Sequence, residues 1–237
     1  MPRKSIAPHA LALPPGPFRR KLLAWYDRSA RDLPWRRTRD PYQVLVSEVM
    51  LQQTQVTRVR EYYPRFLERF PDVESLASAP ARAVREAWDG LGYYARARNL
   101  HALAKHVTRR HDGTLPDTPE ELIELPGIGR YTAGAVASFA YEKPVPAVDT
   151  NVSRVIRRVF FNRATGNGQR ATEIWRIAAT LVPRNGKRAW KFNQAMMELG
   201  ALVCTARKPK CGECPVRSGC KAGRRFKQEV GSGKGEA

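Results

Sequence analysis

Apolar residues recur at helical spacing along almost the whole body of this chain, and no segment shows the sustained two-residue alternation of a strand. Residues typical of helix N-termini occur between these helical segments. Asp72 precedes a short apolar run, and Thr118-Pro119-Glu120-Glu121 has the form of a capping box with proline in the first turn. We therefore predict an all-α fold, with helices over residues 18–29, 42–53, 57–70, 73–79, 80–90, 95–111, 131–141, 151–161, 170–181 and 189–203 and a further helix after Thr118.

The charge of the chain favours a polyanionic partner. Among 237 residues, 42 are Lys or Arg and 22 are Asp or Glu, a net charge of +20, while 42% are hydrophobic and suffice for a buried core. Nucleic acid is the commonest partner of so basic a chain; a merely solvated basic surface is the alternative. No uninterrupted apolar run of 18 residues occurs and the N-terminal segment does not resemble a signal peptide. We expect a cytoplasmic monomer that associates with nucleic acid and does not engage a membrane.

All four cysteines lie within 17 residues near the C-terminal end: Cys204, Cys211, Cys214 and Cys220. In a chain without a secretion signal, such clustering favours metal binding over disulfides. Structural zinc sites usually contain two CxxC-like pairs, but only one is present, whereas a [4Fe–4S] cluster accommodates wider spacing because each thiolate binds a different iron. We expect a [4Fe–4S] cluster, with zinc as the alternative. The loop between the first two cysteines is half basic, and we expect Lys208 and Lys210 to contact phosphate.

A glycine-containing turn, Leu125-Pro126-Gly127-Ile128-Gly129, joins two expected helices. Two glycines allow a ligand to approach the backbone closely, and the N–H groups that start the next helix favour an anion. An ordinary tight turn is the alternative. In a basic, all-helical chain, this frame favours a helix-hairpin-helix, in which Gly127 and Gly129 grip a DNA phosphate without reading the base sequence.

Two carboxylates occupy positions that are unusual for solvated side chains. Glu48 lies inside an apolar helical run, so we expect burial to raise its pKa and make it a candidate general acid; a position on the solvent side of the helix is the alternative. Asp149 follows an extended stretch bounded by proline and precedes a helix, so it is a good N-cap whose charge the helix N-terminus would stabilise. A neutral acid beside an ionised carboxylate is the pair expected for cleavage of a glycosidic bond.

Taken together, these motifs resemble the helix-hairpin-helix/Gly-Pro-Asp superfamily of DNA base-excision glycosylases, with an iron–sulfur tail of the endonuclease III type. The resemblance covers about residues 18–222. Within the superfamily, the matching stretches are most similar to the adenine-excising type; they span residues 31–36, 47–56, 91–100 and 192–201.

The resemblance implies two helical lobes with a DNA-binding cleft between them. One is a six-helix barrel over residues 33–143 that carries the hairpin; the other is an iron–sulfur lobe formed by residues 18–32 and 144–222. A flexible arm over 1–17 and a flexible tail over 223–237 are expected to flank them.

The resemblance also implies roles for individual residues around a nucleotide flipped out of the duplex. Glu48 would protonate the departing base, Asp149 would stabilise the sugar cation, and Asn151 and Tyr131 would be their hydrogen-bonding helpers. For Trp35 and Tyr93, core packing is the alternative. The implied DNA and base contacts are Arg31, Trp35, Arg36, Gln53, Tyr93 and Gln194, of which Gln53 and Tyr93 would fill or wedge the emptied base stack.

Two departures from the superfamily pattern bear on the activity. Lyase members carry Lys at the position of Tyr131, so we expect a monofunctional enzyme; Tyr at this position occurs in both adenine and thymine glycosylases. The chain ends 17 residues after Cys220, and the resemblance implies that adenine-excising relatives continue into a domain that recognises 8-oxoguanine. We therefore predict removal of adenine opposite G or 8-oxoguanine in double-stranded DNA. The preference for one of these opposite bases over the other should be smaller than in relatives that have the second domain. The alternatives are thymine or uracil removal opposite G and, third, a catalytically silent DNA-binding protein.

Overall fold

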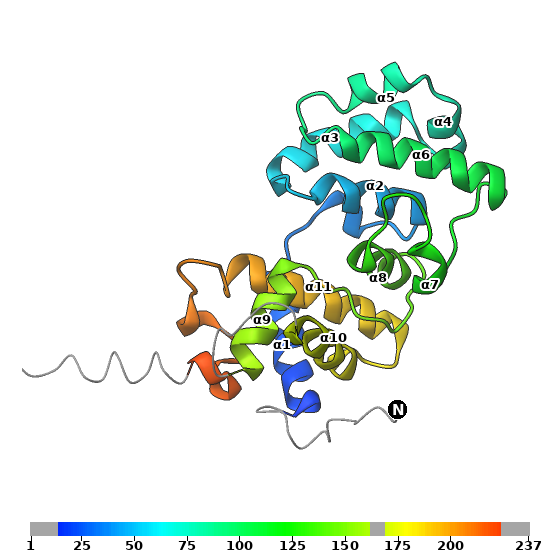
Figure 1. Cartoon of the computed structure of the whole chain (residues 1–237). Helices are drawn as coiled ribbons and strands as arrows, with labels where there is room; N and C mark the ends of the chain where they lie inside the picture. The colour runs from blue at the N-terminus through cyan, green and yellow to red at the C-terminus, as the bar shows by residue number, and fades with distance from the viewer. Residues whose placement is uncertain (1–13, 162–168, 224–237) are drawn as a thin grey trace, which may run out of the picture. The chain divides into compact units, whose positions relative to one another are not determined.

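The computed structural model describes residues 14–161 and 169–223, and within these ranges every regular element is a helix, which confirms the all-α prediction (Figure 1). None of these described helices is both long and apolar enough to cross a membrane. The elements are α1 (Pro15–Ser29), η2 (Pro34–Arg36), α2 (Pro41–Leu51), α3 (Val56–Arg69), α4 (Val73–Ser78), α5 (Ala81–Ala87), α6 (Ala95–Arg110), α7 (Pro119–Leu122), α8 (Arg130–Phe139), α9 (Thr150–Phe160), α10 (Gln169–Leu181), α11 (Gly186–Leu202), η3 (Cys211–Glu213) and η4 (Arg217–Gly219).

Local capping explains where several helices begin. The Asp72 carboxylate accepts a hydrogen bond from the Ser75 backbone N–H at 2.7 Å, and Ser75 Oγ accepts one from the Asp72 N–H at 3.2 Å. This reciprocal capping box starts α4, as the sequence predicts. Thr118 Oγ1 caps α7 by accepting from the Glu121 N–H at 3.3 Å, and it donates to Glu121 Oε2 at 2.6 Å. Each cap satisfies a backbone donor that the first helical turn leaves without a partner.

The ends of the expected arm and tail need correction. Helix α1 begins at Pro15, so residues 15–17 are helical; proline suits a first turn because the N–H it lacks would have no helical partner there. Gly223 is buried, and its N–H donates to Cys220 Sγ at 3.3 Å, so it does not belong to a flexible tail. The rest of the predicted arm and tail lies outside the described residues.

The chain divides into two compact units, which are described separately. Arg31–Lys143 forms the first, named the hairpin unit; the chain up to Ala30 and from Pro144 onward forms the second, named the cluster unit. In the hairpin unit, α2 packs against α3, α6 and α8, and α6 also packs against α4 and α5. In the cluster unit, α11 packs against α1 and α9, and α10 packs against α9 and α1. The buried core of the cluster unit is apolar and includes fully buried Phe18 and Leu199.

Candidate functional site

The candidate acid of the hairpin unit, Glu48, lies in the last turns of α2 and is 3% exposed. Apart from Ser47, the buried residues around it in α2 are hydrophobic, because other helices of the unit cover this helix on several sides. Burial of Glu48 is thus confirmed, and the alternative position on the solvent side of the helix is wrong. The effect of this burial on the pKa of Glu48 stays a prediction.

Tyr131 contacts this buried carboxyl group directly. It is the second residue of α8, and its Oη donates a hydrogen bond to Glu48 Oε2 at 2.6 Å. The contact joins residues 83 positions apart, and it depends on the packing of α2 against α8. A second link, from Gln52 Nε2 to Thr132 Oγ1 at 3.4 Å, joins the C-terminal end of α2 to the same helix. The phenol therefore orients the carboxyl group.

The glycine turn connects α7 to α8 in the predicted hairpin. Gly127 has φ +78, and a Cβ there would lie 2.8 Å from Cβ of Asn99, so both backbone and packing require glycine. Gly129 is the N-cap of α8, and a Cβ built on it would meet no described atom within 4 Å. Both glycines are exposed. The start of α8 therefore presents an approachable backbone, which is the geometry of an anion site.

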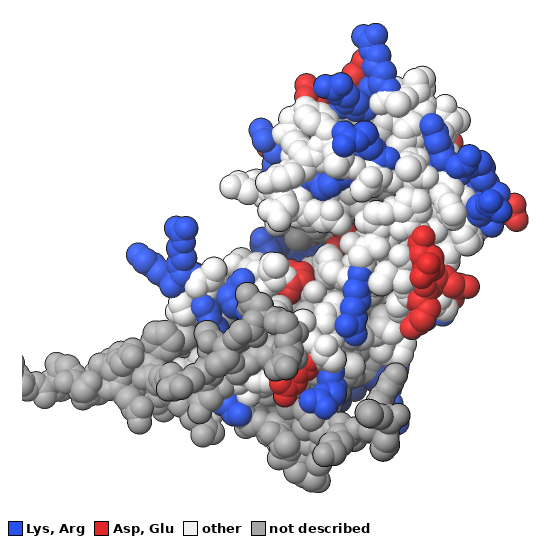
Figure 2. Space-filling view, viewed as in Figure 1, with Lys and Arg blue, Asp and Glu red and all other residues white. Residues whose placement is uncertain are grey.

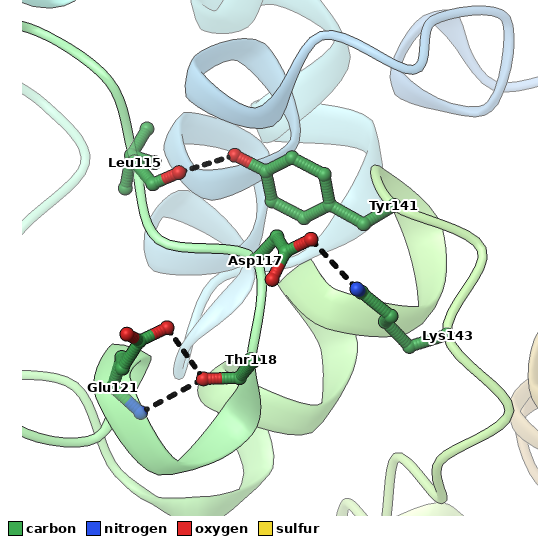
Figure 3. Close-up of polar contacts among 6 residues, drawn as sticks. All are labelled: Leu115, Asp117, Thr118, Glu121, Tyr141 and Lys143. Carbon is green, nitrogen blue, oxygen red and sulfur yellow. Dashed lines mark hydrogen bonds and ion pairs between the residues drawn. The ribbon is translucent and has the colours of Figure 1, made fainter.

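Polar contacts close the base of the hairpin (Figure 3). Tyr141, beyond α8, donates from Oη to the Leu115 carbonyl at 2.6 Å. Lys143 Nζ lies 2.6 Å from Asp117 Oδ2. These contacts tie the segment before α7 to the segment after α8, so the turn between the two helices is held at both ends.

The charges around the hairpin restrict how a phosphate can approach it. Glu120, Glu121 and Glu124 are exposed on and after α7, and Figure 2 shows acidic side chains gathered over that helix. Arg130, beside Gly129, is also exposed. Because the carboxylates repel an anion, the start of α8 is the more favourable point of contact.

In the cluster unit, Asp149 is the N-cap of α9. Its Oδ1 accepts a hydrogen bond from the Val152 N–H at 2.7 Å, and its Oδ2 accepts one from Asn151 Nδ2 at 2.8 Å. The predicted cap is therefore confirmed, and the expected helper, Asn151, contacts the carboxylate. Glu48 belongs to the hairpin unit and Asp149 to the cluster unit.

The pKa of Asp149 departs from the sequence-based expectation. Burial raises the pKa of this carboxyl group, and the hydrogen bonds from Val152 and Asn151 and the charge of Arg154 oppose that rise without cancelling it. The N-terminus of α9 stabilises the charge, as expected, but desolvation of the charged form outweighs the favourable contacts, so the pKa lies above its ordinary value. Ionisation of Asp149 in the folded protein therefore costs more free energy than ionisation of a solvated aspartate.

Packing around Asp149 fixes both its flanks. Asn193 in α11 donates from Nδ2 to the Val145 carbonyl at 2.8 Å and accepts from the Ala147 N–H at 3.4 Å, which holds the extended stretch before Asp149. Gly200 in the same helix permits a close approach, since a Cβ there would lie 2.6 Å from Cβ of Asn151. Asn193 and Gly200 thus position the start of α9 against α11.

The four cysteines surround a cavity of about 160 Å³ in the cluster unit. Its other lining residues are apolar, such as Val203 and Val216, or cationic, such as Arg158 and Arg217. Within the described ranges, no three Cys, His, Asp or Glu side chains converge as a single metal ion would require. Four thiols around one cavity fit the four ligands of an iron–sulfur cluster, and the arginines in its lining would offset the negative charge of the cluster.

Burial raises the pKa of Cys214 to about 11 and shifts the pKa values of Cys211 and Cys220 in the same direction. Because a metal binds the thiolate form, cluster assembly must displace protons from these thiols.

Two arginines of α9 connect that helix to the cysteine loop, and one of them also contacts the start of the helix. Arg158 donates to the carbonyls of Thr205 at 2.6 Å and Ala206 at 2.8 Å. Arg154 donates from Nε to the Cys204 carbonyl at 2.8 Å and from Nη2 to Asn151 Oδ1 at 2.7 Å. A continuous chain of hydrogen bonds therefore runs from Asp149 through Asn151 and Arg154 to Cys204.

The expected base-pocket residues occupy different environments. Trp35 is 7% exposed and packs edge-on against Tyr63 at 5.7 Å between ring centroids, so it contributes to the core of the hairpin unit. Arg31 and Arg36 lie close to it, and Arg36 Nη1 donates to the Arg31 carbonyl at 3.0 Å. Gln194 is buried in α11 of the cluster unit.

Gln53 and Tyr93 share an uncommon backbone conformation. Their φ values are +59 and +47, in the left-handed region that non-glycine residues rarely adopt. Gln53 is exposed, and Tyr93 is 64% exposed, far more than most large apolar side chains. Exposed side chains on constrained turns suit insertion into a base stack.

Lys208 and Lys210 are both exposed in the cysteine loop. Lys210 Nζ lies 3.9 Å from Glu213 Oε2, so an acidic neighbour offsets part of its charge.

Sequence reasoning missed Arg96, Arg154, Arg158 and Asn193 as residues that organise the site. A signal was available for Arg96, because it lies on the same helical stripe as buried Leu100 and Leu103, where a charge is unexpected. For the others, the contacts that organise the site are mostly made to residues distant in sequence, such as the Cys204 carbonyl for Arg154, and no local pattern identifies them.

The chain belongs to the HhH-GPD superfamily of base excision DNA repair proteins, whose family model matches residues 46–183. Residues 204–220 match the iron-sulfur binding domain of endonuclease III. The second match confirms the [4Fe–4S] cofactor prediction, and the zinc alternative is wrong.

Within the superfamily, the sequence is 46% identical to adenine DNA glycosylase of Rattus norvegicus over 230 residues, which cover 92% of this chain and 43% of that protein. The chain thus spans less than half the length of this curated relative. A solved thermostable thymine-DNA glycosylase is 32% identical with a TM-score of 0.82, and the match covers 89% of this chain and 97% of the other. A trapped endonuclease III–DNA covalent intermediate is 26% identical with a TM-score of 0.74, covering 91% and 99% of the two chains.

Proposed function

We propose that the chain is a monofunctional DNA N-glycosylase that removes adenine mispaired with G or 8-oxoguanine from double-stranded DNA. The buried Glu48 carboxyl group, held by Tyr131 Oη at 2.6 Å, is the observation that carries this proposal. A phenol at this position orients an acid and cannot form the Schiff base of a lyase. The 46% identity to a mammalian adenine DNA glycosylase supports adenine as the target base.

The proposed reaction is hydrolysis of the N-glycosidic bond. Glu48 donates its proton to a ring nitrogen of adenine, and the base then leaves as a neutral molecule with the electron pair of the broken C1′–N bond. The sugar becomes an oxocarbenium ion, whose positive charge the Asp149 carboxylate stabilises. Water adds to C1′, and its proton restores the carboxyl group of Glu48. Asn151 and Tyr131 orient the two carboxyl groups.

DNA binding would use the exposed start of α8 and the basic cysteine loop. Gly129 exposes the backbone at the hairpin, while Lys208 supplies a cation in the loop. Both are phosphate contacts in this proposal, and they carry no base preference.

A panel of four duplexes tests the proposed activity: adenine opposite 8-oxoguanine, adenine opposite G, thymine opposite G and uracil opposite G. Single-turnover excision of adenine from the first two, with thymine and uracil left intact, is the expected result. The solved thymine-DNA glycosylase at TM-score 0.82 favours a second candidate, excision of thymine or uracil opposite G. Salt-dependent duplex binding without excision of any base would instead indicate a silent DNA-binding protein.

We further propose that Cys204, Cys211, Cys214 and Cys220 are the four cluster ligands. Each thiolate would bind one iron, so these residues would hold the cluster as a structural link in the loop, with no iron offered to substrate. The purified protein is expected to be brown and to contain about four irons and four sulfides per chain. Cys214→Ser should lower that content and destabilise the cluster unit, which iron analysis and thermal unfolding measure. Full iron content in this variant would remove Cys214 from the ligand set.

A further inference from the structure

One buried arginine, Arg96 in the first turns of α6, joins the two turns that carry Gln53 and Tyr93. It is 8% exposed, and its guanidinium group is surrounded by backbone oxygens. Nη1 and Nη2 donate within 2.5–3.1 Å to the carbonyls of Val49, Met50, Gln52, Leu91 and Gly92 and to Oγ1 of Thr54.

The location of these acceptors explains why a buried cation is tolerated without an ion pair to any described carboxylate. Val49 and Met50 belong to the last turn of α2, where carbonyls lack helical partners and the helix dipole is negative. The ring centroids of Trp88 and Tyr93 lie 5.4 and 5.6 Å from the guanidinium carbon, so two aromatic faces also contact the charge.

The two turns that Arg96 joins contain the left-handed residues Gln53 and Tyr93. Such conformations cost free energy and persist where the surroundings hold them. Arg96 reaches the carbonyl of Gln52 on one turn and the carbonyl of Gly92 on the other, each adjacent to a left-handed residue. Lysine could not replace it, because a single ammonium group cannot span six acceptors in two directions.

We propose that Arg96 is a positioning residue that locks these two turns, so that Gln53 and Tyr93 are fixed in the conformation that displaces a base from the duplex. The proposal rests on the glycosylase function proposed above. Arg96 then serves extrusion of the target nucleotide and not the cleavage of the bond. Because Arg96 orders the two turns before DNA binds, the free energy of ordering them is not added to the free energy of unstacking the base.

The experiment compares Arg96→Lys with Arg109→Lys, a charge-preserving control at the exposed end of the same helix. Single-turnover rates are measured for adenine opposite G and for adenine opposite an abasic site, where no pairing opposes extrusion. For Arg96→Lys we expect a loss of roughly ten- to a hundredfold with the paired substrate and less than about threefold with the unpaired one. Equal losses with both substrates, or none with either, would overturn the proposal.

A milder variant guards against failure of Arg96→Lys to fold. Thr54→Val preserves shape and removes the hydroxyl that accepts from Arg96 Nη2 at 3.0 Å. It should show a smaller loss with the same dependence on pairing.

Hydrogen exchange provides a readout that does not depend on activity. In Arg96→Lys, amides of residues 52–54 and 91–93 should exchange at least about tenfold faster, with α3 unchanged. If the wild-type protein excises no base, the proposed function is wrong. Hydrogen exchange then still tests whether Arg96 holds the two turns. Unchanged exchange at both turns would show that Arg96 does not hold them.

Discussion

The two candidate catalytic carboxylates occupy contrasting environments. Glu48 lies within a helix among apolar side chains, and the phenol of Tyr131 is its hydrogen-bond donor. Asp149 lies at a helix N-terminus, where a backbone N–H and the Asn151 amide donate to its two oxygens. The second environment offers the stronger support for a negative charge, since both oxygens are hydrogen-bonded at the positive end of a helix. The difference supports the proposed roles, in which Glu48 donates the proton and Asp149 stabilises the sugar cation.

The largest effect is expected when the proposed proton donor, Glu48, is substituted. Glu48→Gln keeps the shape of the side chain but cannot donate the proton, so single-turnover excision of adenine should fall by about a hundred- to ten-thousandfold. Duplex affinity, measured by fluorescence anisotropy, should stay close to that of the wild type. Substantial excision by this variant would place the acid elsewhere.

At Asp149, substitution by asparagine separates charge from capping. Asp149→Asn keeps an oxygen that can accept from the Val152 N–H, but it removes the charge opposite the sugar cation. We expect excision to fall by roughly a hundred- to a thousandfold. Asp149→Ala is the matched variant that also loses the cap, at about 1 kcal/mol of stability. Wild-type rates in Asp149→Asn would show that this charge is dispensable.

The same variant gives a pH-dependent difference in stability. Burial raises the pKa of Asp149 above its unfolded value, so the folded state holds this proton more tightly than the unfolded state does. The stabilising contribution is therefore present at low pH and is lost as pH rises through the folded pKa. Asp149→Asn lacks this loss, and its melting temperature relative to the wild type should increase as pH rises from about 4 towards 7. A difference independent of pH would contradict the assigned direction.

A smaller effect is expected where α11 meets α9. Gly200→Ala would place Cβ 2.6 Å from Cβ of Asn151, so one helix must shift. We expect about 1–3 kcal/mol of destabilisation by chemical denaturation. Gly16→Ala is the control, because the nearest described atom to its Cβ would be the distant end of Arg20, at 3.7 Å. Equal stability of the two variants would show that α9 and α11 accommodate the added methyl group without strain.

The smallest expected effect concerns phosphate binding. Lys208→Ala should reduce the slope of log affinity against log salt by up to about 0.9. Lys210→Ala should change it less, because Glu213 lies beside that ammonium group. The discrimination between mismatched and matched duplexes should be unaffected by either change. A slope identical to that of the wild type in both variants would remove this loop from the DNA interface.

Features that depend on neighbouring residues were predictable from the sequence. The caps at Asp72, Thr118 and Asp149 follow from side chains that contact a backbone N–H three residues away. Burial of Glu48 follows from an apolar helix. The spacing of the cysteines indicates the kind of metal group, because ligands close together in the sequence can bind only a group that their spacing fits.

Predictions that depended on the balance of long-range contacts were less secure. The sequence indicates a cap at Asp149, but it does not reveal how deeply the carboxyl group is buried, and burial decides the direction of its pKa. Trp35 illustrates the same limit, since it lies buried against Tyr63. An aromatic side chain in a matching motif does not by itself indicate whether it packs in a core or lines a pocket.

By itself, the sequence determined the helical class, the glycine turn, the cluster segment, the burial of Glu48 and the cap at Asp149, because spacing, capping and backbone preference are local properties of a chain. Only the tertiary structure decided that Tyr131 meets Glu48 across 83 residues and that Arg154 reaches the Cys204 carbonyl across 50. It also decided that Arg96 joins two turns more than 35 residues apart. These contacts arise from the packing of whole helices, which no local pattern encodes.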